Sequence, residues 1–178
     1  MSNMRAKPLL AFAALIGIAG TASAQQSRGN PSALAGHDIG APVDVAADRI
    51  EVQDREDRAL FVGNVVVRQA NLTLNTARLR IAYASTGGLD IQRLDASGGV
   101  TLTSPSETAR GDYAIYDLDG GIITLVGDVE LRQGPNQING SRLTIDLDNG
   151  RAVIDGGPRG VDQSGGRVTG RFTVPSRD

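Results

Sequence analysis

The nine residues Phe61–Gln69 read FVGNVVVRQ, and this stretch sets the pattern for the rest of the chain. In it, a glycine and a polar residue are followed by a short run of β-branched side chains. Similar arrangements return as ASGGVTLTS at 96–104 and as LVGDVELRQ at 125–133, with their glycines 35 and 29 residues apart. Such spacings are typical of repeat architectures, in which one unit cannot bury its apolar face alone and stacks on its neighbours.

Apolar and polar side chains alternate around Gly63, Gly98 and Gly127. The positions two and four residues to either side of each glycine are apolar, and so are those 16 and 18 residues after it. They are Ala59, Phe61, Val65, Val67, Leu79, Ile81, Leu94, Ala96, Val100, Leu102, Ala114, Tyr116, Ile123, Leu125, Val129, Leu131, Leu143 and Ile145. Of the twelve intervening positions at three, five, 15 and 17 residues after the glycines, nine are polar. Because successive side chains of a strand point to opposite faces, this pattern predicts repeated pairs of amphipathic strands.

The repeat is incomplete at both ends of the chain. A worn copy follows Gly156, with Phe172 at the apolar spacing, but Pro158 breaks its first strand. Ile50 and Val52 look like the second half of a unit whose first half is missing. The two ends of the repeat array are therefore expected to differ from each other.

Turn chemistry separates the predicted strands. Gly-rich and Asp-rich stretches such as TGGLD, DLDGG and DLDNG supply the positive φ angles of tight hairpin turns. No segment shows a convincing helical period, and Pro175 is expected to stop a last strand over Arg167–Val174. We therefore predict an all-β, antiparallel domain whose short strands form two facing sheets, as in a jelly roll or a flattened, barrel-like solenoid.

The first 24 residues have the organisation of a secretory signal peptide. Arg5 and Lys7 precede the apolar run Leu9–Ala19, and the small residues TASA end at Ala24. An uncleaved membrane anchor is the alternative, but eleven apolar residues are short for a span that needs about 20. We predict cleavage after Ala24. In the absence of a lipoprotein cysteine, export to a bacterial periplasm is expected.

Composition bounds the exported part. Residues 25–42 are rich in Gly, Ser, Pro and Ala and are predicted to form a flexible lead-in, followed by one domain over 43–175 and a tail of 176–178. The whole chain has 18 basic and 20 acidic residues and no cysteine. The absence of a basic stripe argues against nucleic-acid binding, and no disulfide framework is available.

Reactive groups are sparse. The single histidine, His37, falls in the lead-in and is predicted to be a solvated bystander. The pairs Asp117 with Asp119 and Asp146 with Asp148 could serve as acid and base, but each lies beside a Gly-bearing turn, where Asp is expected for local hydrogen bonds. The motifs of EF-hand loops, nucleotide-binding loops and serine hydrolases are missing. The sequence predicts no enzyme, no cofactor and no metal site.

A family resemblance gives the apolar face a meaning beyond that of a plain core. Residues Ala47–Tyr83, ADRIEVQDREDRALFVGNVVVRQANLTLNTARLRIAY, resemble the opening of the OstA-like family of lipopolysaccharide-transport proteins. The matching elements are the Ala-Asp start, the following strand, and Gly-Asn-Val with Gln69 four residues beyond the valine. LVGDVELRQG repeats the phrase, and 167–175 resembles the closing strand of the family. Ala70 departs from the family, which usually has glycine there.

The resemblance spans Val43–Pro175 and implies a slightly open, twisted β jelly roll built from repeated strand pairs. It implies a periplasmic bridge that carries lipopolysaccharide from the inner to the outer membrane during outer-membrane assembly. Such a bridge holds acyl chains in an apolar groove and stacks head to tail on itself, on an LptC-like inner-membrane partner and on an LptD-like outer-membrane translocon. The implied lipid-binding residues are Phe61, Val65, Val67, Leu79, Ile81, Leu94, Val100, Leu102, Tyr116, Leu125, Val129, Leu131, Leu143 and Ile145; the implied partner edges carry Ile50, Val52, Val168 and Phe172.

Two alternatives stay open at this point. The chain could be an LptC-like anchored member of the same pathway, which the short apolar run disfavours. It could also be a structural, adhesive or carbohydrate-active β-solenoid, although an enzyme of that kind should gather carboxylates on one groove instead of scattering them at turns. Alternation alone does not separate groove-lining positions from a closed core, since both are apolar and face inward.

Overall fold

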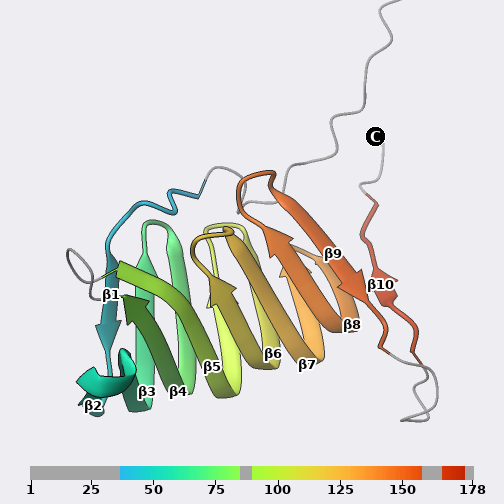
Figure 1. Cartoon of the computed structure of the whole chain (residues 1–178). Helices are drawn as coiled ribbons and strands as arrows, with labels where there is room; N and C mark the ends of the chain where they lie inside the picture. Colours follow the sequence, from blue (N-terminus) through green and yellow to red (C-terminus); the bar gives the residue numbers. More distant parts are fainter. Residues whose placement is uncertain (1–36, 85–89, 158–165, 175–178) are drawn as a thin grey trace, which may run out of the picture.

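The computed structural model describes residues 37–84, 90–157 and 166–174, and in these residues it shows one ten-stranded antiparallel sheet (Figure 1). The strands are β1 (Val43–Ala46), β2 (Arg49–Gln53), β3 (Arg58–Gln69), β4 (Leu72–Ala84), β5 (Asp90–Thr103), β6 (Glu107–Asp117), β7 (Ile122–Gln133), β8 (Asn136–Asp146), β9 (Arg151–Asp155) and β10 (Thr169–Arg171). A single 3-10 turn, η1 (Asp54–Glu56), follows β2. No helix in this part of the chain is long and apolar enough to cross a membrane. The predicted all-β antiparallel class is confirmed.

The long strands β3 to β8 pair in the order in which they occur along the chain. Two short strands share each outermost long strand: β1 and β2 both pair with β3, and β9 and β10 both pair with β8. The expected end strand over Val43–Val52 is therefore two strands, which pair with different halves of β3. The expected last strand over Arg167–Val174 is shorter, because only Thr169–Arg171 pairs with β8.

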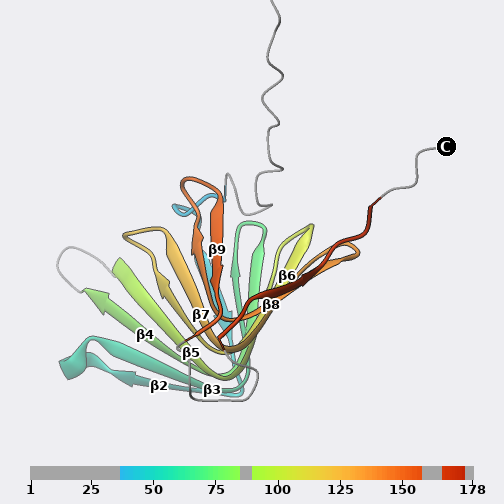
Figure 2. The ribbon, with the colours of Figure 1, turned by 90° about the vertical axis from the view of Figure 1, so that its right-hand side faces the viewer.

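The repeated glycine marks the place where each long strand bends. Gly63, Gly98 and Gly127 have φ angles of 82°, 85° and 84°, which side chains on Cβ disfavour. The register between successive strands shifts at these points, as it does between Val62 and Val65 in β3. A bulge of this kind bends the strand and strengthens its twist. In Figure 2, which looks along the row of strands, the sheet is consequently folded into a V whose successive strands rotate.

The bend divides the sheet into two arms. The β1 arm comprises residues 43–46, 65–69, 72–76, 100–103, 107–110, 129–133, 136–140 and 169–171, and the β2 arm comprises 49–62, 78–84, 90–97, 113–117, 122–126 and 142–155. The inward faces of the two arms meet in one hydrophobic core. Leu79, Leu125 and Leu143 are fully buried there. The alternation seen in the sequence thus correctly separates the inner face from the outer face.

Candidate functional site

The predicted lipid-binding residues all lie inside the V. Thirteen of the fourteen are buried, and Leu131 is partly buried and packs against the same core. Their cross-strand registers join them into continuous apolar rows that run across the strands. One row of the β2 arm is Ile81, Leu94, Tyr116, Ile123 and Ile145. The interior is therefore an apolar track that extends from β4 to β8.

The track is closed in this structure. A cavity of about 20 Å³ lies among residues that include Val67, Leu94 and Tyr116, and one of about 10 Å³ lies among residues that include Leu102 and Leu131. For comparison, one water molecule occupies about 30 Å³ in the liquid. The two arms are packed directly against each other, so the interior is a filled core in this state.

A polar contact joins the two arms inside this apolar surrounding. The Tyr116 hydroxyl, on the β2 arm, donates a hydrogen bond of 2.9 Å to Oε1 of Gln69, on the β1 arm. The same Gln69 side chain donates through Nε2 to the carbonyl oxygens of Ile39 and Ala41, at 2.8 and 3.1 Å. Those two donations fix which end of the amide is oxygen. Gln69 thereby ties the β2 arm, the β1 arm and the segment 37–42 together.

His37 completes this arrangement, which we call the Gln69 cluster: His37, Gln69, Asn71 and Tyr116. The Nε2 atom of His37 lies 3.2 Å from Gln69 Oε1, and its Nδ1 atom lies 3.0 Å from Asn71 Oδ1. Since Gln69 Oε1 is an acceptor, Nε2 carries a proton. His37 is 7% exposed, and Gln69 is 3% exposed. The prediction of a solvated His37 is wrong, because its partners lie more than 30 residues away and no local pattern announces them.

Burial keeps the phenol of Tyr116 protonated. Desolvation raises its pKa to about 12, and the carboxylate of Asp148 adds to the rise. The hydroxyl therefore stays a hydrogen-bond donor at every physiological pH. All buried side-chain polar atoms of the described residues have a hydrogen-bond partner. The Gln69 cluster is thus a satisfied polar contact within an apolar interior.

The carboxylate pairs singled out in the sequence have turn roles. Asp117 Oδ1 accepts a hydrogen bond of 3.2 Å from the amide of Gly120, and Asp146 accepts two from Asn149, at 2.9 and 2.7 Å. The Asn149 hydrogen bonds lower the pKa of the Asp146 carboxyl. These groups support the hairpins and do not face a shared cleft. Across residues 37–84, 90–157 and 166–174, no three His, Cys, Asp or Glu side chains gather as metal ligands.

The predicted partner edges lie at opposite ends of the sheet. Ile50 and Val52 are exposed on β2, while Val168 and Phe172 are exposed on either side of β10. Within the described chain, β1 and β2 pair with β3 alone, and β9 and β10 pair with β8 alone. Each of these four strands therefore has one side without a neighbouring strand, next to apolar side chains that face solvent.

Comparisons with known proteins agree with this architecture. The family model described as LptA/(LptD N-terminal domain) LPS transport protein matches residues 44–151. An uncharacterized protein of Rhizobium meliloti is 33% identical over 172 residues, covering 93% of this chain and 87% of its own. The lipopolysaccharide export system protein LptA of Haemophilus influenzae is 23% identical over 116 residues, covering 62% of this chain and 67% of its own.

A solved structure has the same fold. It is that of LptH, the LptA-homologous periplasmic component of the lipopolysaccharide transport device of Pseudomonas aeruginosa. The superposition has a TM-score of 0.66 at 18% identity and covers 78% of this chain and 99% of that one. With the family match over more than half of its length, this chain belongs to the LptA/LptD N-terminal domain family of lipopolysaccharide transport proteins.

Proposed function

We propose that this protein is a periplasmic bridge that carries lipopolysaccharide from the inner to the outer membrane, with the acyl chains held between its two arms. The observation that carries the proposal is the set of continuous apolar rows inside the V. Moving an acyl chain through water costs about 0.8 kcal/mol per methylene, so a chain of a dozen carbons needs a shielded path worth on the order of 10 kcal/mol. Hydrophobic attraction is non-directional, which lets a chain slide along such a path.

Cargo binding in this proposal requires the arms to part. Ligand sites for small molecules enclose roughly 300–1,000 Å³, far more than the cavities of about 20 and 10 Å³ inside the closed V. The acyl chains replace arm-to-arm contacts with arm-to-chain contacts, so the buried apolar surface is conserved. The hydrogen bond between Tyr116 and Gln69 spans the two arms and must break or lengthen when they separate.

The unpaired edges provide the route from one molecule to the next. We expect the edge formed by β1 and β2 to dock on the edge formed by β9 and β10 of another copy, or on matching domains of LptC-like and LptD-like partners. Because the two edges differ, this contact repeats head to tail and builds an open filament. The apolar rows of successive molecules then form one continuous track between the membranes.

A substitution inside the track tests the proposal. Val100 is buried on the inner face of β5, and its neighbour Thr101 points outward. We expect Val100→Asp to lose lipopolysaccharide that co-purifies from the periplasm, while Thr101→Asp, with the same added charge, retains it. Circular dichroism checks that both variants fold, and Val100→Thr replaces Val100→Asp if the latter does not. A folded inner-face variant that binds lipopolysaccharide as well as the wild type would contradict the proposal.

A further inference from the structure

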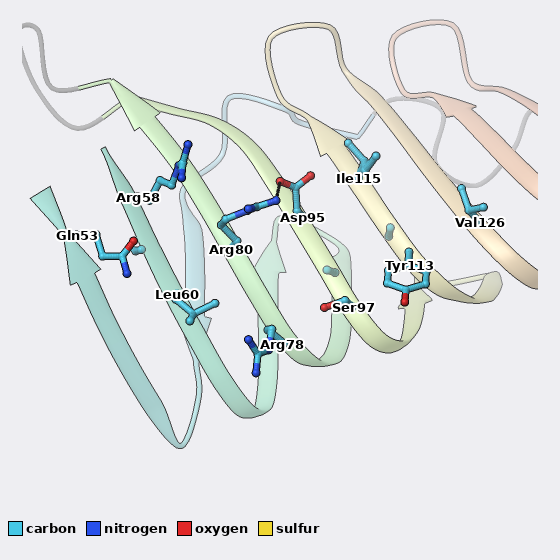
Figure 3. Close-up of a pocket in the computed structure, with 13 residues that line it drawn as sticks. Gln53, Arg58, Leu60, Arg78, Arg80, Asp95, Ser97, Tyr113, Ile115 and Val126 are labelled. Atoms are coloured by element: carbon cyan, nitrogen blue, oxygen red, sulfur yellow. Dashed lines mark hydrogen bonds and ion pairs between the residues drawn. The ribbon is translucent and has the colours of Figure 1, made fainter. Parts of the chain in front are cut away.

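A second depression lies on the outer face of the β2 arm, on the side of the sheet away from the core (Figure 3). Its volume is about 730 Å³, many times that of either interior cavity. We call it the outer groove and define it by Leu60, Arg78, Arg80, Tyr113, Ile115 and Val126, which line it. These side chains come from β3, β4, β6 and β7.

The floor of the outer groove breaks the alternation that governs the rest of the outer face. Tyr113 is 59% exposed, and it faces Val126 directly across the β6–β7 pair. Ile115 lies two residues further along β6, on the same face as Tyr113. Core packing does not explain these side chains, because the core lies on the opposite side of the strands. They form an exposed apolar patch of the kind that marks binding surfaces.

Arginines border this apolar floor on one side. In register across the sheet, Arg78 is followed by Ser97 and then by Tyr113. The next row on the same face places Arg80 beside Asp95, and Asp95 beside Ile115. Each row thus leads from a guanidinium group to an apolar side chain over the width of two strands.

The positive charge of this border is not neutralised within the described residues. Asp95 is shared between Arg80, at 3.2 Å, and Arg93, at 2.7 Å, so one carboxylate serves two guanidinium groups. Arg78 has no carboxylate within 4.0 Å in the described part of the chain. This local excess of cations contrasts with the formal net charge of −2 for the whole protein.

We propose that the outer groove binds an anionic phospholipid, with the phosphate at Arg78 and Arg80 and an acyl chain over Tyr113, Ile115 and Val126. Arginine recognises phosphate oxygens through paired N–H donors, and the groove volume falls within the roughly 300–1,000 Å³ of ligand sites. An acidic peptide would match the charge but not the apolar floor. This site is separate from the interior track and does not depend on it.

The test uses dihexanoyl phosphatidylglycerol, a short-chain anionic lipid, titrated below its micelle concentration into the isotope-labelled exported protein. We expect the backbone amide signals of Ser97, Tyr113 and Val126 to shift in a saturable manner, while those of Leu102 and Leu125 stay in place. The zwitterionic dihexanoyl phosphatidylcholine is expected to bind about five-fold or more weakly, from a contribution of roughly one favourable contact per arginine. Equal binding of the two lipids, or shifts confined to the interior, would overturn the proposal.

Matched variants separate the groove from general electrostatics. Arg78→Gln is expected to weaken phosphatidylglycerol binding about five-fold. Arg68→Gln removes the same charge from an exposed arginine on the outer face of the β1 arm and should leave binding unchanged. Tyr113→Ser should weaken binding of both lipids. Equal losses in the two arginine variants, or equally tight binding of an acidic hexapeptide at the same amides, would reject an anionic phospholipid site.

The interior and the outer groove fail independently in these experiments. Arg78→Gln should keep lipopolysaccharide capture at the wild-type level, whereas a folded Val100→Asp variant should keep phosphatidylglycerol binding. Loss of lipopolysaccharide capture in the Arg78 variant would mean that the outer groove belongs to the cargo path, and it would contradict a separate site.

Discussion

The hydroxyl of Tyr116 donates to the side-chain oxygen of Gln69 across the interior of the V, at 2.9 Å. The two residues belong to different arms, and Gln69 also accepts from His37 and donates to two carbonyls of the segment 37–42. This contact is polar, directional and placed between apolar rows. It therefore favours the closed state specifically, in contrast to the non-directional packing around it.

Tyr116→Phe removes this directional contact and keeps the ring in the core. We expect the free energy of unfolding to fall by about 1 kcal/mol, the usual contribution of one hydrogen bond. We also expect faster initial capture of lipopolysaccharide, because the arms part more easily. Denaturant unfolding and a stopped-flow binding assay measure the two effects. Tyr113→Phe, on the outer face, is the control, and slower capture by the Tyr116 variant would contradict a closing role.

The raised pKa of Tyr116 predicts a loss of stability in alkali. The folded-state value of about 12 exceeds the value of about 10 for an exposed tyrosine, so the unfolded chain releases this proton first. The stabilisation is complete below pH about 10 and is lost as the pH rises toward 12. Unfolding midpoints between pH 9 and 12 should fall more steeply for the wild type than for Tyr116→Phe. Parallel curves for the two proteins would contradict the prediction.

The bend should depend on glycine itself. Gly127 has a φ of 84°, and a Cβ atom there would meet the side chain of Asp112. We expect Gly127→Ala to lower the free energy of unfolding by at least about 1–2 kcal/mol. Gly134→Ala is a matched control, since Gly134 also has a positive φ, of 55°, but nothing lies within 4 Å of its Cβ position. Equal losses in the two variants would show that contacts at the bend do not matter.

Head-to-tail docking makes a prediction about mixtures. Val52→Asp damages one edge, and Phe172→Asp, at a residue 64% exposed, damages the other. Each variant alone should sediment as a monomer at concentrations where the wild type forms filaments. A mixture of the two retains one intact pair of edges and should stop at a dimer. Persistent dimers of either variant alone would indicate a contact between like edges, and Thr103→Asp controls for added charge.

The inner face of the fold was predictable because strand geometry requires it. Alternation with a period of two identified Leu79, Leu125 and Leu143 as inward residues without any knowledge of their partners. The same rule could not show that the glycine phrase bends one continuous sheet, since a bulge and a turn use similar residues. Only the structure divides the expected Val43–Val52 strand between two halves of β3.

The polar contact between the arms and the outer groove could not be predicted for a different reason. Both depend on residues distant in sequence that the bend and the cross-strand register bring together, as with His37 and Gln69. Tyr113 and Ile115 were visible as apolar exceptions on the outer face of β6. No local signal indicated that Val126 would extend the same patch.

The central claim is that acyl chains lie between the two arms, and site-specific photo-crosslinking to lipopolysaccharide tests it most directly. Leu102 is buried on the inner face and borders both interior cavities, while its neighbour Thr103 points to the outer face. A photoreactive side chain at position 102 should form lipopolysaccharide adducts, and the same group at position 103 should not. No adduct at either position in a folded protein, or equal adducts at both, would contradict the account and leave the interior as a plain structural core.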